Sequence, residues 1–342
     1  MAKMRAAVCH KPYKLTIEEV DRPEPGPGQA VVKVKATGVC GSDVDGYTGN
    51  HPWIALPKIL GHECSGVVDK VGRGVRKLKK GDAVVVEPFL ICGKCPNCLK
   101  GKYNMCRDIV VIGHQVAGSF AEYILMDERF LHPKPKNISF EVGALAEPIS
   151  GALHGTGRCN LKIGDFVVLI GCGTIGYFLL QHSLNSGARV LVSEPEKRKR
   201  DVALEVGASW VVDPRKESLV DKVMELTDGV GADVVLEAVG VPETVRITTE
   251  VARKGGTILL MGWTGNETDA FDCTTLTLDE MTVLGTMGFA WDFPVTLDLL
   301  ARGKVDAERI ITHRFSLDEA KEALETLHHK RDGIWKAVIV FE

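Results

Sequence analysis

The residues best suited to chemistry fall into three groups, and the first group is a set of four cysteines. They follow the spacing C-x2-C-x2-C-x7-C on a segment rich in Gly, Pro and Asn, and they are Cys92, Cys95, Cys98 and Cys106. Four thiolates so close in sequence can converge on one tetrahedral ion, and because they leave no coordination position open, that ion would be a structural zinc. Two disulfides or an iron–sulfur cluster are the alternatives. A structural zinc predicts that chelation loosens this lobe without removing the chemistry.

A second group of potential ligands is dispersed along the chain. Cys40 begins the sequence Cys-Gly-Ser-Asp, His62 and Glu63 lie together in a second turn, and Glu147 follows much later. Each residue has an ordinary explanation by itself, because a cysteine or histidine often only packs and an acidic residue often begins a helix. Together they supply sulfur, nitrogen and oxygen donors with a position left open, as a catalytic zinc site requires. Such an ion could polarise a bound hydroxyl group.

The third group is a glycine-rich turn that could bind the phosphates of a dinucleotide. The sequence Gly171-Cys-Gly-Thr-Ile-Gly176 has the spacing G-x-G-x-x-G, follows an apolar strand-like run and precedes a helix-like segment. Gly171 would permit the tight turn, Gly173 the close approach of a pyrophosphate, and Gly176 the close packing of helix against strand. The helix that begins here would present free N–H groups to the phosphates.

The next strand-like run ends at Glu194, 18 residues after Gly176. An acidic side chain at this position can accept hydrogen bonds from both hydroxyls of the adenosine ribose and would repel a 2′-phosphate. Basic residues follow closely at Lys197, Arg198 and Lys199, and such residues could tolerate that phosphate. We therefore expect NAD as the cofactor in preference to NADP.

The elements that must position these groups divide the chain into two parts. Residues 1–147 consist of short apolar runs separated by Gly and Pro, and some runs alternate as half-buried strands do. From residue 148, strand-like runs alternate with helix-length segments, which predicts a parallel, doubly wound sheet. The six runs are 166–170, 189–193, 210–212, 233–237, 257–261 and 282–285. Beyond about residue 290, helical patterns at 294–303 and 317–330 precede a last strand at 336–341, which we expect to rejoin the first domain.

The composition is that of an ordinary globular protein. The chain has 342 residues, of which 45% are apolar, and this length suits two domains with buried cores. The 42 basic and 45 acidic residues leave a net charge of −3, which argues against nucleic acid or an anionic membrane as the main partner. Because no apolar stretch is long enough to span a bilayer and no signal-peptide pattern is present, we expect a cytoplasmic protein.

Taken together, the motifs resemble the zinc-dependent medium-chain alcohol dehydrogenases, in the branch of polyol (sorbitol-like) and threonine dehydrogenases. The resemblance covers nearly the whole chain and rests on the order of five motifs: Cys40-Gly-Ser-Asp, Gly61-His-Glu, the four-cysteine lobe, Glu147-Pro-Ile-Ser, and the Gly171 turn followed by Glu194. It implies a GroES-like β-rich catalytic domain over 1–147, with 291–342 returning to it, and a Rossmann domain over 148–290. It also implies an active site between the domains and a homodimer or homotetramer.

The resemblance assigns roles to the dispersed ligands. Cys40, His62 and Glu63 would bind the catalytic zinc, and a second zinc would occupy the four-cysteine lobe. Glu147 stands where ethanol-type members carry a cysteine ligand, and in the polyol branch it would bind zinc directly or hold the metal-bound water.

The resemblance also implies a path for the proton. Ser42 matches the hydroxyl that relays the proton from the alcohol. The next relay group in the family is often a histidine five residues after the zinc cysteine, but here that position is Asp45. Either Asp45, through water, or His51 would therefore complete the path.

For the cofactor, the resemblance adds residues around the glycine turn and at the strand ends. Thr174 begins the helix after the turn, and Ile175, Glu194 and Lys199 would line the adenosine end. The nicotinamide half would be lined by Val239, Met261, Gly262, Thr286 and Met287.

The expected reaction is hydride transfer from a secondary alcohol of a polyol, sugar alcohol or cyclic polyol of the inositol or inosose type to NAD. An L-threonine-type amino-alcohol dehydrogenase is the alternative within the family. A dinucleotide-binding protein without catalysis is the alternative from another class.

Overall fold

The computed structural model describes residues 2–263 and 271–342. The chain divides into two compact units, of which unit 1 is formed by Met1–Glu147 with Ala290–Glu342 and unit 2 by Pro148–Phe289. In the described part of the chain, no helix is both long and apolar enough to cross a membrane.

Unit 1 is built mainly from antiparallel sheets. A seven-stranded sheet has the order β10-β6-β5-β3-β18-β17, with β9 also paired to β3, and β2-β1-β4 and β7-β8 form two smaller sheets. The strands are β1 (Lys3–Lys11), β2 (Lys14–Asp21), β3 (Gln29–Val39), β4 (Lys58–Ile59), β5 (Glu63–Val71), β6 (Ala83–Val86), β7 (Phe89–Leu90), β8 (Val110–Val111), β9 (Tyr123–Asp127), β10 (Leu131–Pro133), β17 (Ile311–Phe315) and β18 (Lys336–Val340).

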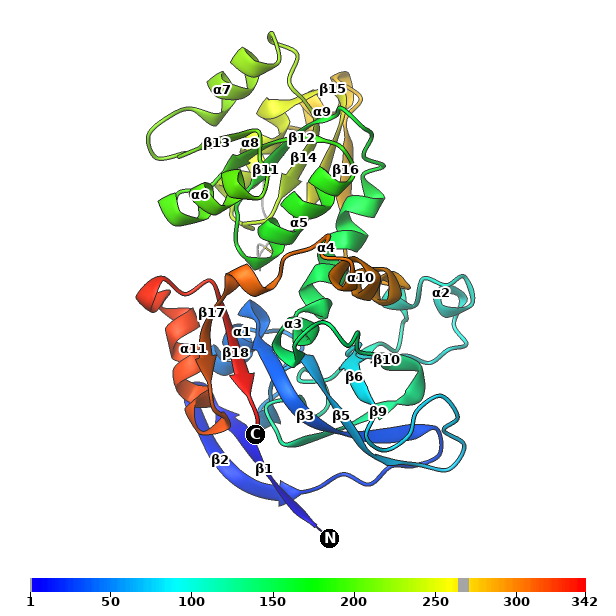
Figure 1. Cartoon of the computed structure of the whole chain (residues 1–342). Helices are drawn as coiled ribbons and strands as arrows, with labels where there is room; N and C mark the ends of the chain where they lie inside the picture. The colour runs from blue at the N-terminus through cyan, green and yellow to red at the C-terminus, as the bar shows by residue number, and fades with distance from the viewer. Residues whose placement is uncertain (1, 264–270) are drawn as a thin grey trace. The chain divides into compact units, whose positions relative to one another are not determined.

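Strand β3 is the centre of the large sheet because β5, β9 and β18 all pair with it. The final strand β18 therefore lies beside β3 although some 300 residues separate them, as the red and blue arrows of Figure 1 show. The buried residues of this region include Tyr47, Leu60 and Phe120 together with Leu317 and Leu324 from the C-terminal segment. The last part of the chain thus completes the core of unit 1.

The helices of unit 1 are short and connect or cover these strands. They are α1 (Gly41–Thr48), α2 (Pro96–Leu99), α3 (Phe140–Ala144), α10 (Asp292–Ala301) and α11 (Ala320–His328). The helical pattern predicted at 317–330 is divided, because a 3-10 turn at Leu317–Glu319 precedes α11. Ser316 and Glu319 form a capping box there, and this fixes where the turn begins.

Unit 2 contains one six-stranded parallel sheet in the order β13-β12-β11-β14-β15-β16, which is the Rossmann order. Its strands are β11 (Phe166–Ile170), β12 (Arg189–Ser193), β13 (Trp210–Val212), β14 (Ala232–Glu237), β15 (Ala252–Leu260) and β16 (Thr282–Gly285). The six predicted runs are all strands. Strand β15 begins five residues before the predicted run, because Ala252 already pairs with Ala232 of β14, and residues 253–256 form an irregularity before regular pairing resumes at Thr257.

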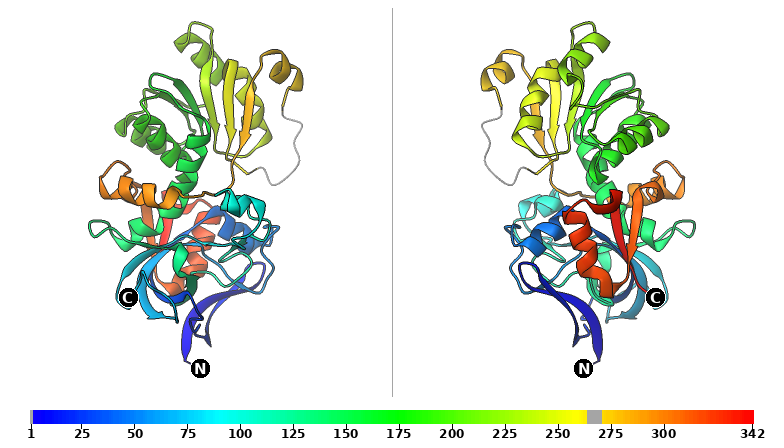
Figure 2. Two further views of the ribbon diagram at one scale, coloured as in Figure 1. Left: turned by 90° about the vertical axis from the view of Figure 1, so that its right-hand side faces the viewer. Right: turned by 90° about the vertical axis from the view of Figure 1, so that its left-hand side faces the viewer.

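Helices lie on both sides of this sheet, with α5 and α6 on one side and α8 on the other (Figure 2). They are α4 (Ala146–Arg158), which crosses the boundary between the units, α5 (Thr174–Asn185), α6 (Lys197–Glu205), α7 (Leu219–Leu226), α8 (Pro242–Val251) and α9 (Cys273–Leu278). Because both faces are covered, β11 is buried along its whole length, which explains its unbroken apolar sequence.

Candidate active site

The dispersed ligands Cys40, His62 and Glu63 come together in unit 1. One ligand atom from each lies within 4.8 Å of the other two. Cys40 follows the end of β3 and precedes α1, whereas His62 immediately precedes β5 and Glu63 is its first residue. Because β3 and β5 are paired, the ends of these segments meet at one edge of the sheet. A sulfur, a nitrogen and an oxygen donor in this arrangement fit a zinc ion and leave a coordination position open.

The carboxylate of Asp43 holds this cluster in place. It is fully buried, and it accepts hydrogen bonds from the backbone N–H of Cys40 and of Gly61, both at 2.9 Å. The Nδ1 atom of His62 lies 3.3 Å from Asp43 Oδ1. Burial alone would raise the pKa of Asp43, but His62 and the Cys40 N–H outweigh it and keep that pKa below its ordinary value. Asp43 thereby fixes the backbone of Cys40 and of Gly61 and places a negative charge beside the His62 ring.

A buried lysine, Lys336 of β18, balances the charge of Glu63. Its Nζ atom lies 2.7 Å from the carboxylate and also donates to the carbonyl oxygen of Val39 at 3.0 Å. Burial alone would lower the pKa of Lys336, but the facing Glu63 carboxylate raises it above its ordinary value. The contact depends on Gly38, because a Cβ atom there would stand 2.0 Å from Glu63 Oε2. Sequence analysis missed Lys336, and the signal for it is a charged residue in an otherwise apolar strand.

Glu147 lies near this cluster without being part of it. It interacts electrostatically with His62, Glu63 and Lys336, but the group of ligand atoms within 4.8 Å of one another does not include it. Burial, together with the negative charge of Glu63, raises the pKa of Glu147 to about 7. This carboxyl group can therefore hold or release a proton near neutral pH.

The three residues expected to carry a proton lie on α1 and the turn after it. Ser42 is half-buried in the first turn of α1, and the backbone carbonyl of Asp45 accepts from the N–H of His51 at 3.2 Å. The His51 ring is buried, and its Nδ1 accepts from the backbone N–H of Trp53 at 3.2 Å. Burial lowers the pKa of His51 despite the negative charge of Asp45. The lowered pKa favours the neutral imidazole, and the ring interacts electrostatically with His62.

His114, which sequence analysis did not single out, lies between His51 and His62. Its ring centroid is 4.6 Å from that of His51 and 5.0 Å from that of His62. Burial, and the neighbouring His62, lower the pKa of His114 to about 3. No signal in the sequence marks it, because only the tertiary structure brings residue 114 beside residues 51 and 62.

The four cysteines of the lobe also converge. Their sulfur atoms are 3.5 Å apart for Cys95 and Cys98, 3.5 Å for Cys92 and Cys106, and 4.0 Å for Cys92 and Cys98. These distances exceed the roughly 2.05 Å of a disulfide, and all the cysteines are free, so the disulfide alternative is wrong for this structure.

Backbone N–H groups surround the same sulfur atoms, and such donors stabilise the negative charge of a thiolate. The N–H of Cys95 donates to Cys92 Sγ, and those of Cys92 and Asp108 donate to Cys106 Sγ, each at 3.4 Å. The N–H groups of Cys98 and Arg107 lower the pKa of the Cys95 thiol. Four sulfur donors with no other ligand type fit a structural zinc.

The glycine-rich turn of unit 2 connects β11 to α5, as the motif requires. Gly171 has φ +89°, and a Cβ atom at Gly176 would stand 2.0 Å from the carbonyl oxygen of Gly171. A Cβ atom at Gly173 would meet nothing within 4 Å, so this position is open to a ligand. Gly173 also caps α5, whose first residues are Thr174 and Ile175. The turn thus directs the N-terminus of α5 toward open space, where a phosphate can bind.

Glu194 lies beside this turn, just after β12. Its carboxylate is buried and accepts from the backbone N–H of Cys172 at 2.8 Å and of Glu196 at 2.9 Å. Two N–H donors fix the carboxylate in position, while further lone pairs remain available for ribose hydroxyls.

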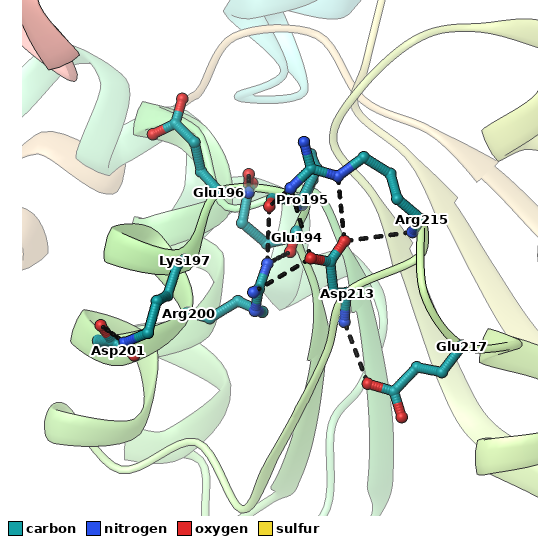
Figure 3. Close-up of polar contacts among 9 residues, drawn as sticks. All are labelled: Glu194, Pro195, Glu196, Lys197, Arg200, Asp201, Asp213, Arg215 and Glu217. Carbon is teal, nitrogen blue, oxygen red and sulfur yellow. Dashed lines mark hydrogen bonds and ion pairs between the residues drawn. The ribbon is translucent and has the colours of Figure 1, made fainter.

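Three basic residues near Glu194 are paired with acidic groups. Lys199 lies 3.1 Å from Glu196. Arg200 and Arg215 both form ion pairs with Asp213, at 3.2 and 3.1 Å (Figure 3). Arg200 also donates to the carbonyl oxygens of residues 194 and 195 at 2.7 Å. These guanidinium groups therefore hold the segment after β12 in place.

The residues expected at the nicotinamide half follow the ends of neighbouring strands, since Val239, Met261 and Thr286 come after β14, β15 and β16. Gly262 and Met287 are next in sequence to two of them. The parallel sheet brings these strand ends to the edge that carries the glycine turn. Sequence analysis missed the buried Glu237, whose carboxylate accepts from the N–H of Val239 at 2.9 Å and of Gly240 at 2.8 Å.

A Rossmann-type sheet with a dinucleotide turn, combined with a Cys-His-Glu cluster and a four-cysteine lobe, defines a zinc-binding oxidoreductase. Comparisons with known proteins agree. The model of the alcohol dehydrogenase GroES-like domain matches residues 26–136, and that of the zinc-binding dehydrogenase domain matches residues 174–302.

Similar proteins extend the match to nearly the whole chain. Sorbitol dehydrogenase from Bacillus subtilis (strain 168) is 31% identical over 328 residues, which are 94% of this chain and 93% of that protein. L-threonine 3-dehydrogenase from Pyrococcus furiosus is 35% identical over 340 residues, 97% of each chain. The crystal structure of a zinc-binding dehydrogenase from Sinorhizobium meliloti 1021, bound to NADP, is 33% identical and has a TM-score of 0.94 over 100% of both chains. The chain therefore belongs to the zinc-dependent medium-chain alcohol dehydrogenase family, and both the predicted family and the predicted fold class are confirmed.

Proposed function

We propose that this protein oxidises a secondary alcohol of a polyol, sugar alcohol or cyclic polyol with NAD, reversibly. The observation that carries the proposal is the convergence of Cys40, His62 and Glu63 on one point of unit 1. In the reaction, the carbinol C–H passes as hydride to the nicotinamide, the O–H releases its proton, and the carbon–oxygen bond becomes a carbonyl.

We assign two zinc ions to each chain. Cys40, His62 and Glu63 would hold the first, and the four cysteines of the lobe would hold the second. Zinc at the first site supplies Lewis acidity, which favours ionisation of an alcohol. Glu147, near this site and with a raised pKa, would hold a water molecule or the substrate rather than the ion itself.

We assign the proton to a path that begins at Ser42 and leaves through His51. A hydroxyl can accept one proton while it donates another, so Ser42 can relay without a lasting charge. His51 suits the next step because burial lowers its pKa, which favours a neutral imidazole able to accept a proton, and because it interacts electrostatically with His62. Asp45 acts on His51 through its charge and through its backbone carbonyl.

We propose NAD rather than NADP as the preferred cofactor. The supporting observations are the fixed carboxylate of Glu194 and the pairing of Lys199, Arg200 and Arg215 with acidic groups. A 2′-phosphate at this position would meet a negative charge, and Lys199, Arg200 and Arg215 would have to leave their acidic partners to bind it.

A neutral polyol fits the site better than threonine does. Threonine carries a carboxylate, which needs a cation, and the lysine of the site is already paired with Glu63. The similarity to both a sorbitol and a threonine dehydrogenase keeps threonine as the alternative substrate.

We further propose that residues 1–147 with 291–342 form the zinc-containing catalytic domain and residues 148–290 the NAD-binding domain. We expect a cytoplasmic homodimer or homotetramer.

An activity screen tests the proposal. The zinc-loaded protein is mixed with sugar alcohols, inositols or L-threonine and with NAD or NADP, and the absorbance of the reduced cofactor is followed. Oxidation of a polyol with NAD supports the proposal, whereas turnover of threonine alone would replace it with the amino-alcohol alternative. Metal analysis tests the alternative that the protein binds a dinucleotide without catalysis. That alternative predicts less than one zinc per chain beyond the zinc of the four-cysteine lobe.

A further inference from the structure

His114 is a buried polar side chain without a partner. It is 8% exposed, and among residues 2–263 and 271–342 neither Nδ1 nor Nε2 of its ring has a hydrogen-bond partner. A buried polar group left unpaired destabilises the fold, because it loses the hydrogen bonds that it makes with water in the unfolded chain. Folded proteins therefore rarely keep one unless a ligand or water binds it.

The backbone around His114 is built to hold the ring at this place. The turn Gly113–Gly118 lies against the segment that ends in His62, because the N–H groups of Gly118 and Ser119 donate to the carbonyls of Ile59 and Gly61 at 2.8 and 2.9 Å. A Cβ atom at Gly113 would stand 2.5 Å from the carbonyl oxygen of Gly61. The turn is thus fixed to the ligand segment by contacts that a larger residue would prevent.

His114 does not take part in the metal cluster itself. The group of ligand atoms within 4.8 Å of one another comprises Cys40, His62 and Glu63, and His114 is outside it. Its ring is nevertheless 5.0 Å from that of His62, centroid to centroid. The ring therefore lies beside the metal cluster without belonging to it.

We propose that His114 recognises a second hydroxyl group, on the carbon next to the reacting carbon, and so selects vicinal diols and polyols over simple alcohols. A neutral imidazole has one donor and one acceptor, and a hydroxyl has both, so the two groups can pair in either sense. An ammonium group such as that of threonine only donates and would leave the imidazole N–H unpaired. This inference rests on the proposed function and names the substrate class of that site.

The test compares 2-butanol with 2,3-butanediol, which share a carbon skeleton and differ in the second hydroxyl. His114→Leu removes both ring nitrogens, His114→Gln keeps a donor and an acceptor, and Val116→Ala changes an exposed residue of the same turn as a matched control. In His114→Leu the KM for the diol should rise about 10- to 100-fold, because a site built for a hydroxyl loses its partner. The KM for 2-butanol should stay within about twofold. His114→Gln should recover much of the loss, and zinc content should be unchanged in all variants.

A binding measurement without turnover separates this inference from the proposed function. The diol should raise the melting temperature of the wild-type and Val116→Ala NADH complexes, but not that of the His114→Leu complex. If the wild type oxidises no alcohol, the proposed function fails. The change in melting temperature caused by the diol still tests whether His114 binds a hydroxyl group. The inference is overturned if His114→Leu affects both alcohols equally, shifts the pH profile, loses zinc, or leaves diol binding unchanged. Greater loss with L-threonine than with the diol would also overturn it.

Discussion

Replacing Lys336 by methionine should destabilise the zinc-free protein strongly. The side chains of Lys336 and Glu63 are 3% and 1% exposed, and Nζ lies 2.7 Å from the carboxylate. Removal of one partner leaves the other charge buried and uncompensated, which costs about 3–5 kcal/mol of unfolding free energy. For a unit of about 200 residues, each kcal/mol lowers the melting temperature by about 2–4 °C. The expected decrease is therefore about 6–20 °C.

Differential scanning calorimetry of four proteins measures the effect: wild type, Lys336→Met, Glu63→Gln and the double variant. A chelator in every sample removes the contribution of zinc equally. Because the two charges compensate one another, the double variant should lose about 1–3 kcal/mol less than the two single variants together. Lys3→Met removes the partner of Asp21 from an exposed ion pair and serves as the control, with an expected melting temperature equal to that of the wild type.

Two results would refute this reasoning. The first is a Lys336→Met protein whose melting temperature equals that of the Lys3→Met control. The second is strictly additive losses in the double variant, which would mean that Lys336 stabilises unit 1 by packing rather than through Glu63.

Four further substitutions test other parts of the molecule. Cys95→Ser should release one zinc per chain and lower the melting temperature while weak activity remains, and an unaltered melting temperature would argue against a structural zinc. Glu63→Gln should reduce turnover at least about tenfold with little change in NAD affinity, as kinetics and NADH titration would show; an unchanged rate would remove Glu63 from the site. Glu194→Ser should raise kcat/KM for NADP relative to NAD by about tenfold, because a negative charge beside the 2′-phosphate is lost. Tyr47 donates to Glu325 at 2.6 Å and lowers the pKa of that carboxyl below its ordinary 4.5. Because the pKa of Glu325 is lower in the folded protein, its ionised carboxylate stabilises the fold at pH values above the ordinary pKa. This stabilisation is lost as the pH falls through the folded-state pKa. Tyr47→Phe should therefore lose about 1–2 kcal/mol near neutral pH and less in acid, as urea unfolding at both pH values would show.

Sequence alone predicted the features that depend on a short stretch of chain. The four cysteines lie within 15 residues, and the glycine turn lies within six, so local geometry alone brings their atoms together. The central strands of unit 2, which are β11, β12 and β14, were also predictable, because strands buried on both faces must be apolar. The basic residues after Glu194 were harder to interpret, since their sequence suggests a phosphate site but the structure pairs Lys199 with Glu196.

Tertiary structure decided two contacts that no sequence motif indicates, and both depend on which strands become neighbours. Lys336 meets Glu63 across 273 positions of sequence because β18 and β5 both pair with β3, and Gly38 of β3 leaves room for the contact. His114 reaches His62 because its turn is hydrogen-bonded to the segment before β5. Side-chain types give the chemistry a site is able to perform, but strand pairing and register determine which of those side chains share one site, and a single sequence does not encode that pairing in any local pattern.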